Sequence, residues 1–480
     1  MAAAGGARPF SWATAEKSFV WNMHMLKAFS AAYNGSEAEC EIMVPVVCGS
    51  LEVREIASNT GESFAIALVS RRSRFRAGVR FFSRGIDDEG MVSNFVETEQ
   101  LVYSLRGVSS FIVVRGSIPL YWQEGEAMLT LKPQPEVLKG AKHVAALTKH
   151  LNSLLHTYGE VVVLSLIDKF GVEGSICESF HDTMRKAYPS ALGTLVPDEW
   201  NDHDTFDKNT SVRYIPFDFH AKVGKTASTE ASGGIATLMV SLQGHIKRHG
   251  LFHEVAEGEK GFKAVKTTQK GVFRVNCIDC LDRTNVVQSV TGLHVLIQQL
   301  AALQLIGQEE LEASLYALHM GYRLPCTRLE KMFKTMWADM GDDISVQYAG
   351  TQALKGDFTR SGKRTIAGMF TDGLSSVKRA VQNNFADVYR QQVMDALHGV
   401  PSQARRQPQV LSLLEGLEAT DGPTAEEVLG VDDDSAPQRP KRNPSSLPDP
   451  PSEYTGEGLA ASDDRMSMDN SDDDYEHHWV

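Results

Sequence analysis

The stretch RVNCIDCLDRTN, residues 274–285, places two cysteines, two aspartates and an arginine within seven consecutive positions. The residues GVFRVN at its start are typical of a short strand. TNVVQSVTGLHVLIQQL, at its end, has helical spacing with Val286, Val287, Val290 and Leu293 on one face. CIDCLDR is therefore a strand-to-helix loop, where backbone N–H groups and the positive end of a helix favour phosphate binding.

The spacing of this loop fits the chemistry of cysteine phosphatases, because five residues separate Cys277 from Arg283. A loop wrapped around a phosphate puts the Cys277 thiolate beneath phosphorus, while Arg283 forks onto two of its oxygens. Attack by the thiolate gives a phosphocysteine intermediate. Asp279 and Asp282 are both candidates for the general acid and base, and Thr284 is placed to hydrogen-bond the thiolate. This chemistry requires no metal and no cofactor. The remaining residues expected to line the substrate site are Asn276, Ile278, Cys280 and Leu281.

Other interpretations of the cysteine pair are weaker. A zinc site needs two further ligands, and His245 and His249, four residues apart, could supply them from one face of a helix. Solvated histidines at a helix end explain the same spacing equally well. A thioredoxin-like CxxC leaves Arg283 and the aspartates unexplained. Cys280 is either a partner for a reversible disulfide or, more simply, a small packing residue.

The bulk composition is that of a globular protein, with 42% hydrophobic and 23% charged residues among 480. The net charge of -13 comes from the tail: residues 401–480 hold 18 acidic and 6 basic side chains, which leaves 43 and 42 in residues 1–400. The near-neutral body argues against nucleic-acid binding. Without a signal peptide, or the apolar run of about 18 residues that a membrane span needs, the six cysteines are expected to be free thiols in the cytoplasm.

The chain is predicted to have three parts. Residues 1–136 carry short apolar runs typical of strands, among them FAIALVS, VRFFSRG and SSFIVVRGSIPLYW. Residues 137–400 alternate helical and strand patterns, which predicts an α/β layer architecture. Within them, TGLHVLIQQLAALQLIG is interpreted as a core helix. Residues 401–480, rich in Pro, Ser, Asp and Glu, are predicted to be mostly disordered.

The longer string RVNCIDCLDRTNVVQS resembles the signature of Sac-domain (suppressor-of-actin) phosphoinositide phosphatases. Further blocks resemble that family in its order along the chain, and the resemblance runs from about residue 19 to residue 400. The blocks are FVWNMHML (19–26), SRRSRFRAGVRFFSRGIDDEGMVSNFVETEQLV (70–102), RGSIPLYW (115–122), YIPFDFH (214–220), QYAGTQALKGDFTRSGKRT (347–365) and NNFADVYRQQVMD (383–395).

The resemblance implies a β-rich N-terminal lobe packed on an α/β lobe with a cysteine-phosphatase core. The activity it implies is removal of a phosphate from the inositol ring of a membrane lipid. By position, Cys277 is the nucleophile, Arg283 the phosphate clamp, and Asp279, slightly preferred, or Asp282 the acid and base. The blocks are most similar to the branch that hydrolyses phosphatidylinositol monophosphates, at the 4- or the 3-phosphate. The implied partners are membrane phosphoinositides, met at the cytosolic face of endomembranes.

The chain departs from the family pattern in three places. Only 18 residues precede FVWN, so part of the N-terminal sheet is expected to be missing. An acidic tail, which has room for an unidentified protein partner, stands where the nearest branch has membrane-spanning helices. FDFH is followed by AKVGK instead of an acidic residue and a cysteine. The alternative is therefore a catalytically weak Sac-like adaptor. A protein tyrosine phosphatase is the other rival, but its loop is normally glycine-rich and follows a histidine.

Three polar groups outside the loop have two interpretations each. Six arginines within residues 71–84 either face anionic lipid or, as we slightly prefer, pair with the nearby acidic residues 87–89, 97 and 99. Asp218 and His220 either supply a proton or tie down a strand end. Lys355 and Arg360, with neighbouring Lys363 and Arg364, either bind the lipid headgroup or belong to an exposed loop. Because the cysteine loop has two carboxylates and one arginine, we also expect monophosphorylated lipids to be preferred.

Overall fold

The computed structural model describes residues 15–33, 43–57, 62–80, 82–124, 134–192, 211–223, 229–257, 262–320, 324–353 and 387–400. The chain divides into two compact units, Met1–Ser412 and Leu413–Val480, and every described residue belongs to the first. The predicted tail, residues 401–480, lies outside the described residues.

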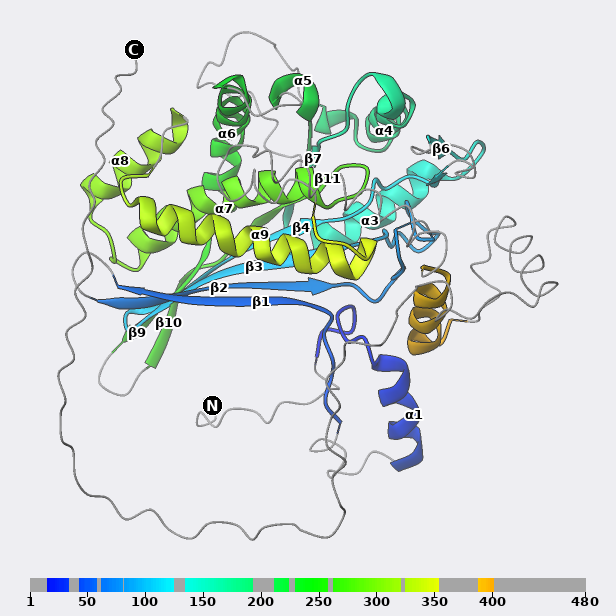
Figure 1. Ribbon diagram of the computed structural model, residues 1–480, viewed down its shortest axis with the longest axis horizontal. Helices are drawn as coiled ribbons and strands as arrows, with labels where there is room; N and C mark the ends of the chain where they lie inside the picture. The colour runs from blue at the N-terminus through cyan, green and yellow to red at the C-terminus, as the bar shows by residue number, and fades with distance from the viewer. Residues whose placement is uncertain are drawn as a thin grey trace, which may run out of the picture. The chain divides into compact units, whose positions relative to one another are not determined.

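A large mixed β-sheet runs through the first unit (Figure 1). Along its main path the described strands follow the order β1-β2-β3-β4-β11-β7-β8, and β9 pairs with both β4 and β10. Neighbours from β1 to β4 are antiparallel, whereas β4, β11, β7 and β8 are parallel. The strands are β1 Gly49–Ala57, β2 Ser63–Arg72, β3 Val96–Ser104, β4 Gly107–Arg115, β7 Glu160–Ser165, β8 Val212–Pro216, β9 Phe252–Glu257, β10 Phe262–Thr267 and β11 Gly271–Asn276; β5 Trp122–Glu124 and β6 Pro135–Val137 form a separate pair.

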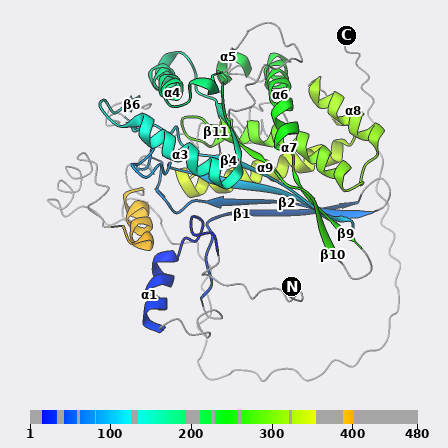
Figure 2. The same cartoon turned by 180° about the vertical axis from the view of Figure 1, so that it is seen from behind.

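Helices cover both faces of the parallel part of the sheet, as the two opposite views show (Figures 1 and 2). Successive residues of β7 alternate between two cores: Val162 and Leu164 pack with α6, α7 and α9, while Val161 and Val163 pack with α3 and α4. This alternation is the period of two expected of a strand covered on both sides. The helices are α1 Met23–Tyr33, α3 His143–Tyr158, α4 Gly174–Ala187, α5 Phe219–Val223, α6 Thr229–His249, α7 Asp282–Ala302, α8 Gln308–His319 and α9 Thr327–Ala349, with 3₁₀ turns η1 Gly171–Glu173 and η2 Pro189–Ala191. Residues 387–398 are also helical.

The predicted mixed α/β class is confirmed, and so are the strand before the cysteine loop and the helix after it. The predicted division at residue 137 lies inside the first unit, and strands from both sides of it join one sheet. The two-lobe description stays a prediction.

Two local predictions in the N-terminal part differ from the structure. VRFFSRG, residues 79–85, was expected to be a strand, but the amide of Ser83 bonds the carbonyl of Val79 (3.0 Å) and Gly85 is left-handed (φ 64°). These are features of a turn. The polar run VETEQLVYS, not predicted as a strand, forms β3. It is buried because Arg71 on β2 pairs with Glu97 and Glu99.

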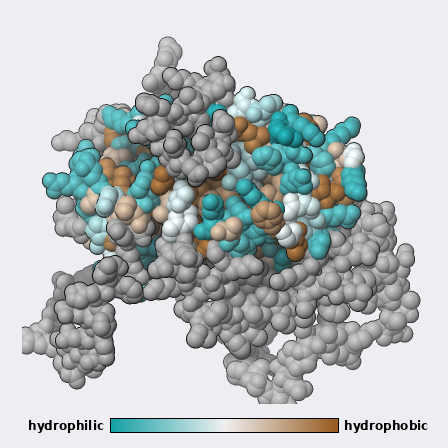
Figure 3. All heavy atoms as spheres, turned by 90° about the horizontal axis from the view of Figure 1, so that it is seen from above, coloured by the Kyte–Doolittle hydropathy of each residue, from teal (hydrophilic) through white to brown (hydrophobic). Residues whose placement is uncertain are grey.

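The apolar run from Thr291 to Gly307 was the nearest match to a membrane span and was interpreted as a core helix. Residues 291–302 form the second part of α7, where most side chains are buried in the core. None of the described helices is long and apolar enough to cross a bilayer. On the face drawn in Figure 3, hydrophilic and hydrophobic side chains of the described residues are interspersed.

Candidate active site

The predicted loop lies where the carboxyl ends of four parallel strands meet. β4 ends at Arg115, β7 at Ser165, β8 at Pro216 and β11 at Asn276. The strand register places Val275 beside Arg115, and Ser165 beside both Asn276 and Pro216. In open α/β sheets, ligands bind outside this edge.

The loop from Cys277 to Asp282 is tightly turned. The backbone amide of Cys280 donates a hydrogen bond to the Cys277 Sγ atom (3.1 Å). Cys280 has a left-handed backbone (φ 53°), and its own thiol donates to the carbonyls of Gly116 (2.8 Å) and Cys277 (3.2 Å). These contacts favour the interpretation of Cys280 as a packing residue that holds the loop against the end of β4.

The environment of Cys277 favours its thiolate. Its side chain is buried, and burial by itself raises the pKa of a thiol. Hydrogen bonding with Cys280 and the charge of Arg283 outweigh burial and the repulsion from Asp279 and Glu173, so the pKa of Cys277 falls to about 6. Burial and the neighbouring Cys277 raise the pKa of Cys280 well above its ordinary value. At neutral pH the first cysteine is therefore mostly thiolate, and the second is a neutral thiol.

Arg283, in the first turn of α7, is held by groups that follow β7. Its two terminal nitrogens donate to the two carboxylate oxygens of Glu173 (2.9 and 2.5 Å), and Nη1 also approaches the Leu166 carbonyl (3.0 Å) and Asp168 (3.4 Å). Burial lowers the pKa of Arg283, but the charges of Cys277, Glu173 and Asp168 outweigh it and raise the pKa. The guanidinium thus stays charged and fixed beside the thiolate.

A second group of polar residues follows β7 and β8. The Asp168 carboxylate and the His220 Nδ1 atom are 2.6 Å apart. Burial raises the pKa of Asp168, but His220 and Arg283 outweigh this and lower it. Asp218 instead accepts bonds from the backbone amides of Lys169 (3.0 Å) and Ala221 (2.9 Å). These contacts favour the interpretation that Asp218 ties down a strand end. His220 instead pairs with Asp168, which contacts Arg283, so the interpretation that His220 supplies a proton stays open.

Two arginines from the 71–84 cluster bind the cysteine loop. Asp279 accepts hydrogen bonds from Arg80 Nε (2.9 Å) and Arg84 Nη2 (2.8 Å). Arg84 also donates to the Ile278 carbonyl (3.1 Å) and forms an ion pair with Glu124. The prediction that the cluster pairs with nearby acidic residues is correct for Arg71, but wrong for Arg80 and Arg84, which reach across the sequence to the loop.

The other predicted site residues lie around the loop in different ways. Asp282 begins α7, and the Thr284 hydroxyl donates to the Leu281 carbonyl (3.1 Å). The Asn276 amide donates to Ser165 Oγ (3.2 Å). Leu281 packs in a buried cluster with α9, and Ile278 is partly buried against the α3/α4 core. Lys355 and Arg360, and with them Lys363 and Arg364, lie outside the described residues.

The histidines considered for zinc are packed in the core. His249 is fully buried against Phe273 of β11, with ring centroids 4.7 Å apart, and His245 is one turn earlier on α6. Among the described residues, no group of three or more His, Cys, Asp and Glu side chains is arranged to hold a metal ion.

Sequence reasoning missed Asp168, Glu173 and the role of Arg80 and Arg84. One of them carried a usable signal: Asp168 lies three residues beyond the strand 160–165, and carboxyl ends of neighbouring parallel strands converge. Glu173 lies in a short 3₁₀ turn, and Arg84 in an irregular segment. Neither position could be placed from local periodicity.

Comparison with known proteins adds independent information. A family model described as "SacI homology domain" matches residues 4–224. Over 387 residues the chain is 37% identical to phosphatidylinositol-3-phosphatase SAC1-B of Danio rerio, covering 80% of this chain and 58% of the relative. It is 36% identical over 388 residues to phosphoinositide phosphatase SAC7 of Arabidopsis thaliana, covering 81% of this chain and 57% of the relative. It is 36% identical over 387 residues to phosphatidylinositol-3-phosphatase SAC1 of Drosophila melanogaster, covering 80% of this chain and 57% of the relative. The chain thus spans less than three fifths of the length of these relatives.

Proposed function

Because the chain belongs to the SacI homology domain family, we propose that it is a phosphoinositide phosphatase acting on phosphatidylinositol monophosphates, at the 4- or the 3-phosphate. The observation that carries this proposal is the pairing of a low-pKa cysteine with a fixed arginine. Cys277 and Arg283 lie in one loop at the carboxyl edge of the parallel strands. The names of the relatives supply the lipid class.

In the proposed reaction, the Cys277 thiolate attacks the phosphorus of the ring phosphate. A sulfur–phosphorus bond forms, and the bond from phosphorus to the inositol oxygen breaks, with its electron pair leaving on that oxygen. Arg283 binds two non-bridging oxygens, since its planar fork matches their geometry. Water then attacks the phosphocysteine, releasing inorganic phosphate and restoring the thiolate. The Thr284 hydroxyl, which donates to the Leu281 carbonyl in the structure, is proposed to turn toward the Cys277 sulfur as it leaves.

The acid that protonates the leaving inositol oxygen is proposed to be a loop aspartate. Asp279 and Asp282 remain the two candidates. Both guanidinium groups that contact Asp279 favour a charged carboxylate, which makes Asp279 a poorer proton donor than its position in the sequence suggested. Asp282, at the start of α7, is therefore preferred as the acid, and as the base that activates water.

The same ion pairs change the argument about lipid preference. The sequence suggested a loop with two carboxylates and one arginine, which would repel extra phosphates. Arg80 and Arg84 offset the charge of Asp279, so the loop offers less repulsion to extra phosphates than its sequence suggested. The preference for monophosphates stays part of the proposal, supported chiefly by the relatives that are named 3-phosphatases.

The proposed architecture is a β-rich N-terminal lobe, residues 1–136, on a cysteine-phosphatase-like catalytic lobe, residues 137–400. The proposed partner is a membrane that carries phosphoinositides, at the cytosolic face of endomembranes. The substrate residues of the loop, Asn276, Ile278, Cys280 and Leu281, would surround the phosphate by their backbone. Lys355 and Arg360 are proposed as headgroup contacts.

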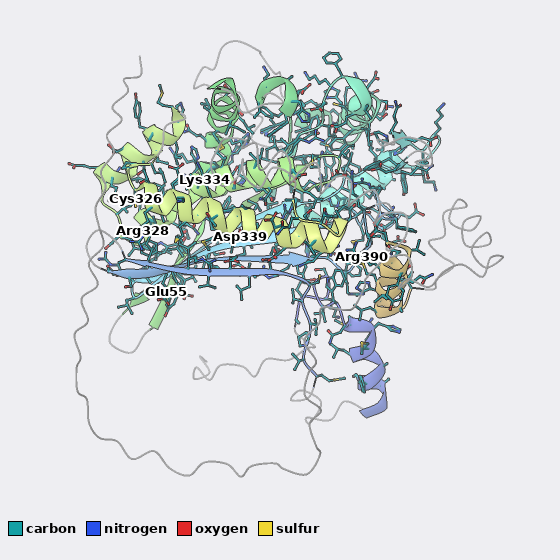
Figure 4. The ribbon with its side chains drawn as sticks, viewed as in Figure 1. Glu55, Cys326, Arg328, Lys334, Asp339 and Arg390 are labelled. Carbon is teal, nitrogen blue, oxygen red and sulfur yellow. The ribbon has the colours of Figure 1, made fainter. Side chains whose placement is uncertain are left out.

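The test is phosphate release from vesicles that contain each phosphatidylinositol monophosphate in turn. Wild type should release phosphate, and Cys277→Ser should release none. Cys326→Ser is the matched control, because Figure 4 shows Cys326 at the start of α9, whereas the last turns of that helix pack on Leu281 of the loop. Those 23 residues separate the two ends by about 34 Å. No release from any lipid by folded wild type would favour the adaptor alternative.

A further inference from the structure

Arg115, the last residue of β4, is a buried cation without a carboxylate partner among the described residues. Its side chain is fully buried, and within the described part of the chain its Nη1 atom donates a hydrogen bond to the amide oxygen of Asn285 (3.4 Å). Its Nε and Nη2 atoms are buried and donate no hydrogen bond to any group in the described part of the chain. Of the other buried arginines near the loop, Arg84 and Arg283 pair with carboxylates, and Arg274 donates to His150, Asn276 and the Ser117 carbonyl. An uncompensated buried charge is costly, so an anion is expected close to Arg115.

The surroundings of Arg115 are the cysteine loop and the first turn of α7. Its neighbour on β11 is Val275, two residues before Cys277. The residue after Arg115 is Gly116, whose carbonyl accepts a hydrogen bond from the Cys280 thiol. The orientation of the Asn285 amide is fixed, because its nitrogen donates to the Trp337 carbonyl (2.8 Å), which leaves the oxygen for Arg115. The guanidinium is therefore enclosed between a strand end, the loop and the helix that carries Arg283.

The negative charges that act on Arg115 belong to the loop. Burial lowers the pKa of Arg115 to about 10, and attraction to Cys280, Cys277 and Asp282 opposes that fall. Because Cys280 stays a neutral thiol and Asp282 is proposed to carry the proton for the leaving oxygen, the thiolate of Cys277 is the anion that remains beside Arg115.

We propose that Arg115 is a positioning residue, which stabilises the thiolate of Cys277 from beneath the loop and holds the first turn of α7 for Arg283. It does not contact the substrate. The inference rests on the proposed function in one respect only, the assignment of Cys277 as the nucleophile. The charged and titratable groups that face Cys277 are Arg115 from β4, Glu173 from η1, Arg283 from α7, and Asp279 and Cys280 from its own loop.

The test measures how fast iodoacetamide alkylates Cys277 as a function of pH. Trypsin cleavage after Arg274 and Arg283 yields the peptide 275–283, and its fragmentation in the mass spectrometer separates Cys277 from Cys280. Wild type should show a midpoint near pH 6. Arg115→Met should move the midpoint upward, by less than loss of Arg283 would, while Arg115→Lys, which keeps the charge, should stay closer to wild type.

Arg213→Met is the matched control. Arg213 is another buried arginine of the same sheet, but it lies on β8, beside Val162 near the start of β7, away from the carboxyl edge. The midpoint of Cys277 alkylation in the Arg213→Met variant should equal that of wild type. An unchanged midpoint in a folded Arg115→Met would overturn the proposal, and if that variant does not fold, an unshifted Arg115→Gln would overturn it equally. Alkylation needs no turnover, so a protein inactive on lipids with the expected midpoints would refute the proposed function and leave the role of Arg115 standing.

Discussion

Arg283 combines two contacts that lysine cannot reproduce together. Its fork donates to both oxygens of Glu173, and the same planar group is proposed to bind two oxygens of the substrate phosphate. A lysine ammonium is a point charge on a flexible stem, so it would lose the fixed orientation even where it keeps the charge. The geometry of the Arg283 side chain therefore predicts that a lysine at this position slows the reaction.

Arg283→Lys should lower kcat/KM for a phosphatidylinositol monophosphate by about 100-fold or more, the cost of removing one oriented donor from a charged transition state. The measurement is steady-state phosphate release from vesicles. Arg328→Lys is the control, since Arg328 is exposed near the start of α9 (Figure 4), and its rate should match wild type. Equal rates for Arg283→Lys and wild type would remove Arg283 from the site.

At the residue scale, the lowered pKa of the Cys277 thiol was predictable from the loop itself. The thiolate of Cys277 follows from a cysteine at a strand-to-helix turn, with Arg283 six residues later in the first turn of the helix. The partners of the loop were not predictable, since Arg84 is 195 residues from Asp279 and Glu173 is 110 residues from Arg283. Only the sheet order, with β4 and β7 on either side of β11, brings these segments together.

At the scale of elements, α7 and α9 must approach closely for Asn285 to be fixed. Gly341 of α9 makes this possible, because a Cβ atom there would lie 2.6 Å from the Asn285 amide nitrogen. Asn285 in turn bonds the Trp337 carbonyl and Arg115. The helix pair thus orients the first turn of α7, which carries Arg283.

Gly341→Ala should destabilise the protein by about 1–3 kcal/mol, because the added methyl group displaces Asn285 in a tightly packed contact. Urea unfolding measures the effect. Gly244→Ala on α6 is the matched control: a Cβ there meets nothing within 4 Å, and alanine should stabilise this helix interior by about 0.5–1 kcal/mol. A Gly341→Ala variant as stable as wild type would contradict the close approach of the two helices.

Elements were predictable where their periodicity was strong. The strand 271–276, the helix from 282 and the helix 143–158 all follow from apolar spacing. β3 was missed because it buries polar side chains on both faces, Glu97 on one and Gln100 on the other, whose partners Arg71 and Gln299 lie on other elements. The turn that contains Ser83 and Gly85 was mistaken for a strand because the buried Val79 belongs to no ladder.

At the scale of the whole molecule, the first unit buries neutral histidines. Burial lowers the pKa of four of them, to about 3 for His150 and His249 and to about 4 for His245 and His294. In the unfolded chain their pKa returns to about 6.5. Below pH 6.5 the unfolded state therefore binds more protons, and stability that is complete above pH 6.5 is lost as the pH falls toward 3.

His249→Gln should make stability less sensitive to acid. Between pH 7 and pH 5, wild type should lose about 2 kcal/mol more than the variant, because one buried imidazole no longer gains a proton on unfolding. Urea unfolding at both pH values measures the difference. His156→Gln, at an exposed position of α3, should keep the wild-type dependence. The same loss in wild type and His249→Gln would show that His249 does not couple folding to pH.

The central claim is that Cys277 carries the phosphate during turnover, and the most direct measurement is a search for that intermediate. A monophosphate substrate is mixed rapidly with wild type, and the reaction is stopped within the first turnover with denaturing detergent at neutral pH. Mass spectrometry of the peptide 275–283 should then show one phosphate on Cys277, and none in Cys277→Ser. Phosphate release without any phosphorylated Cys277 peptide, or release that persists in Cys277→Ser, would contradict the mechanism.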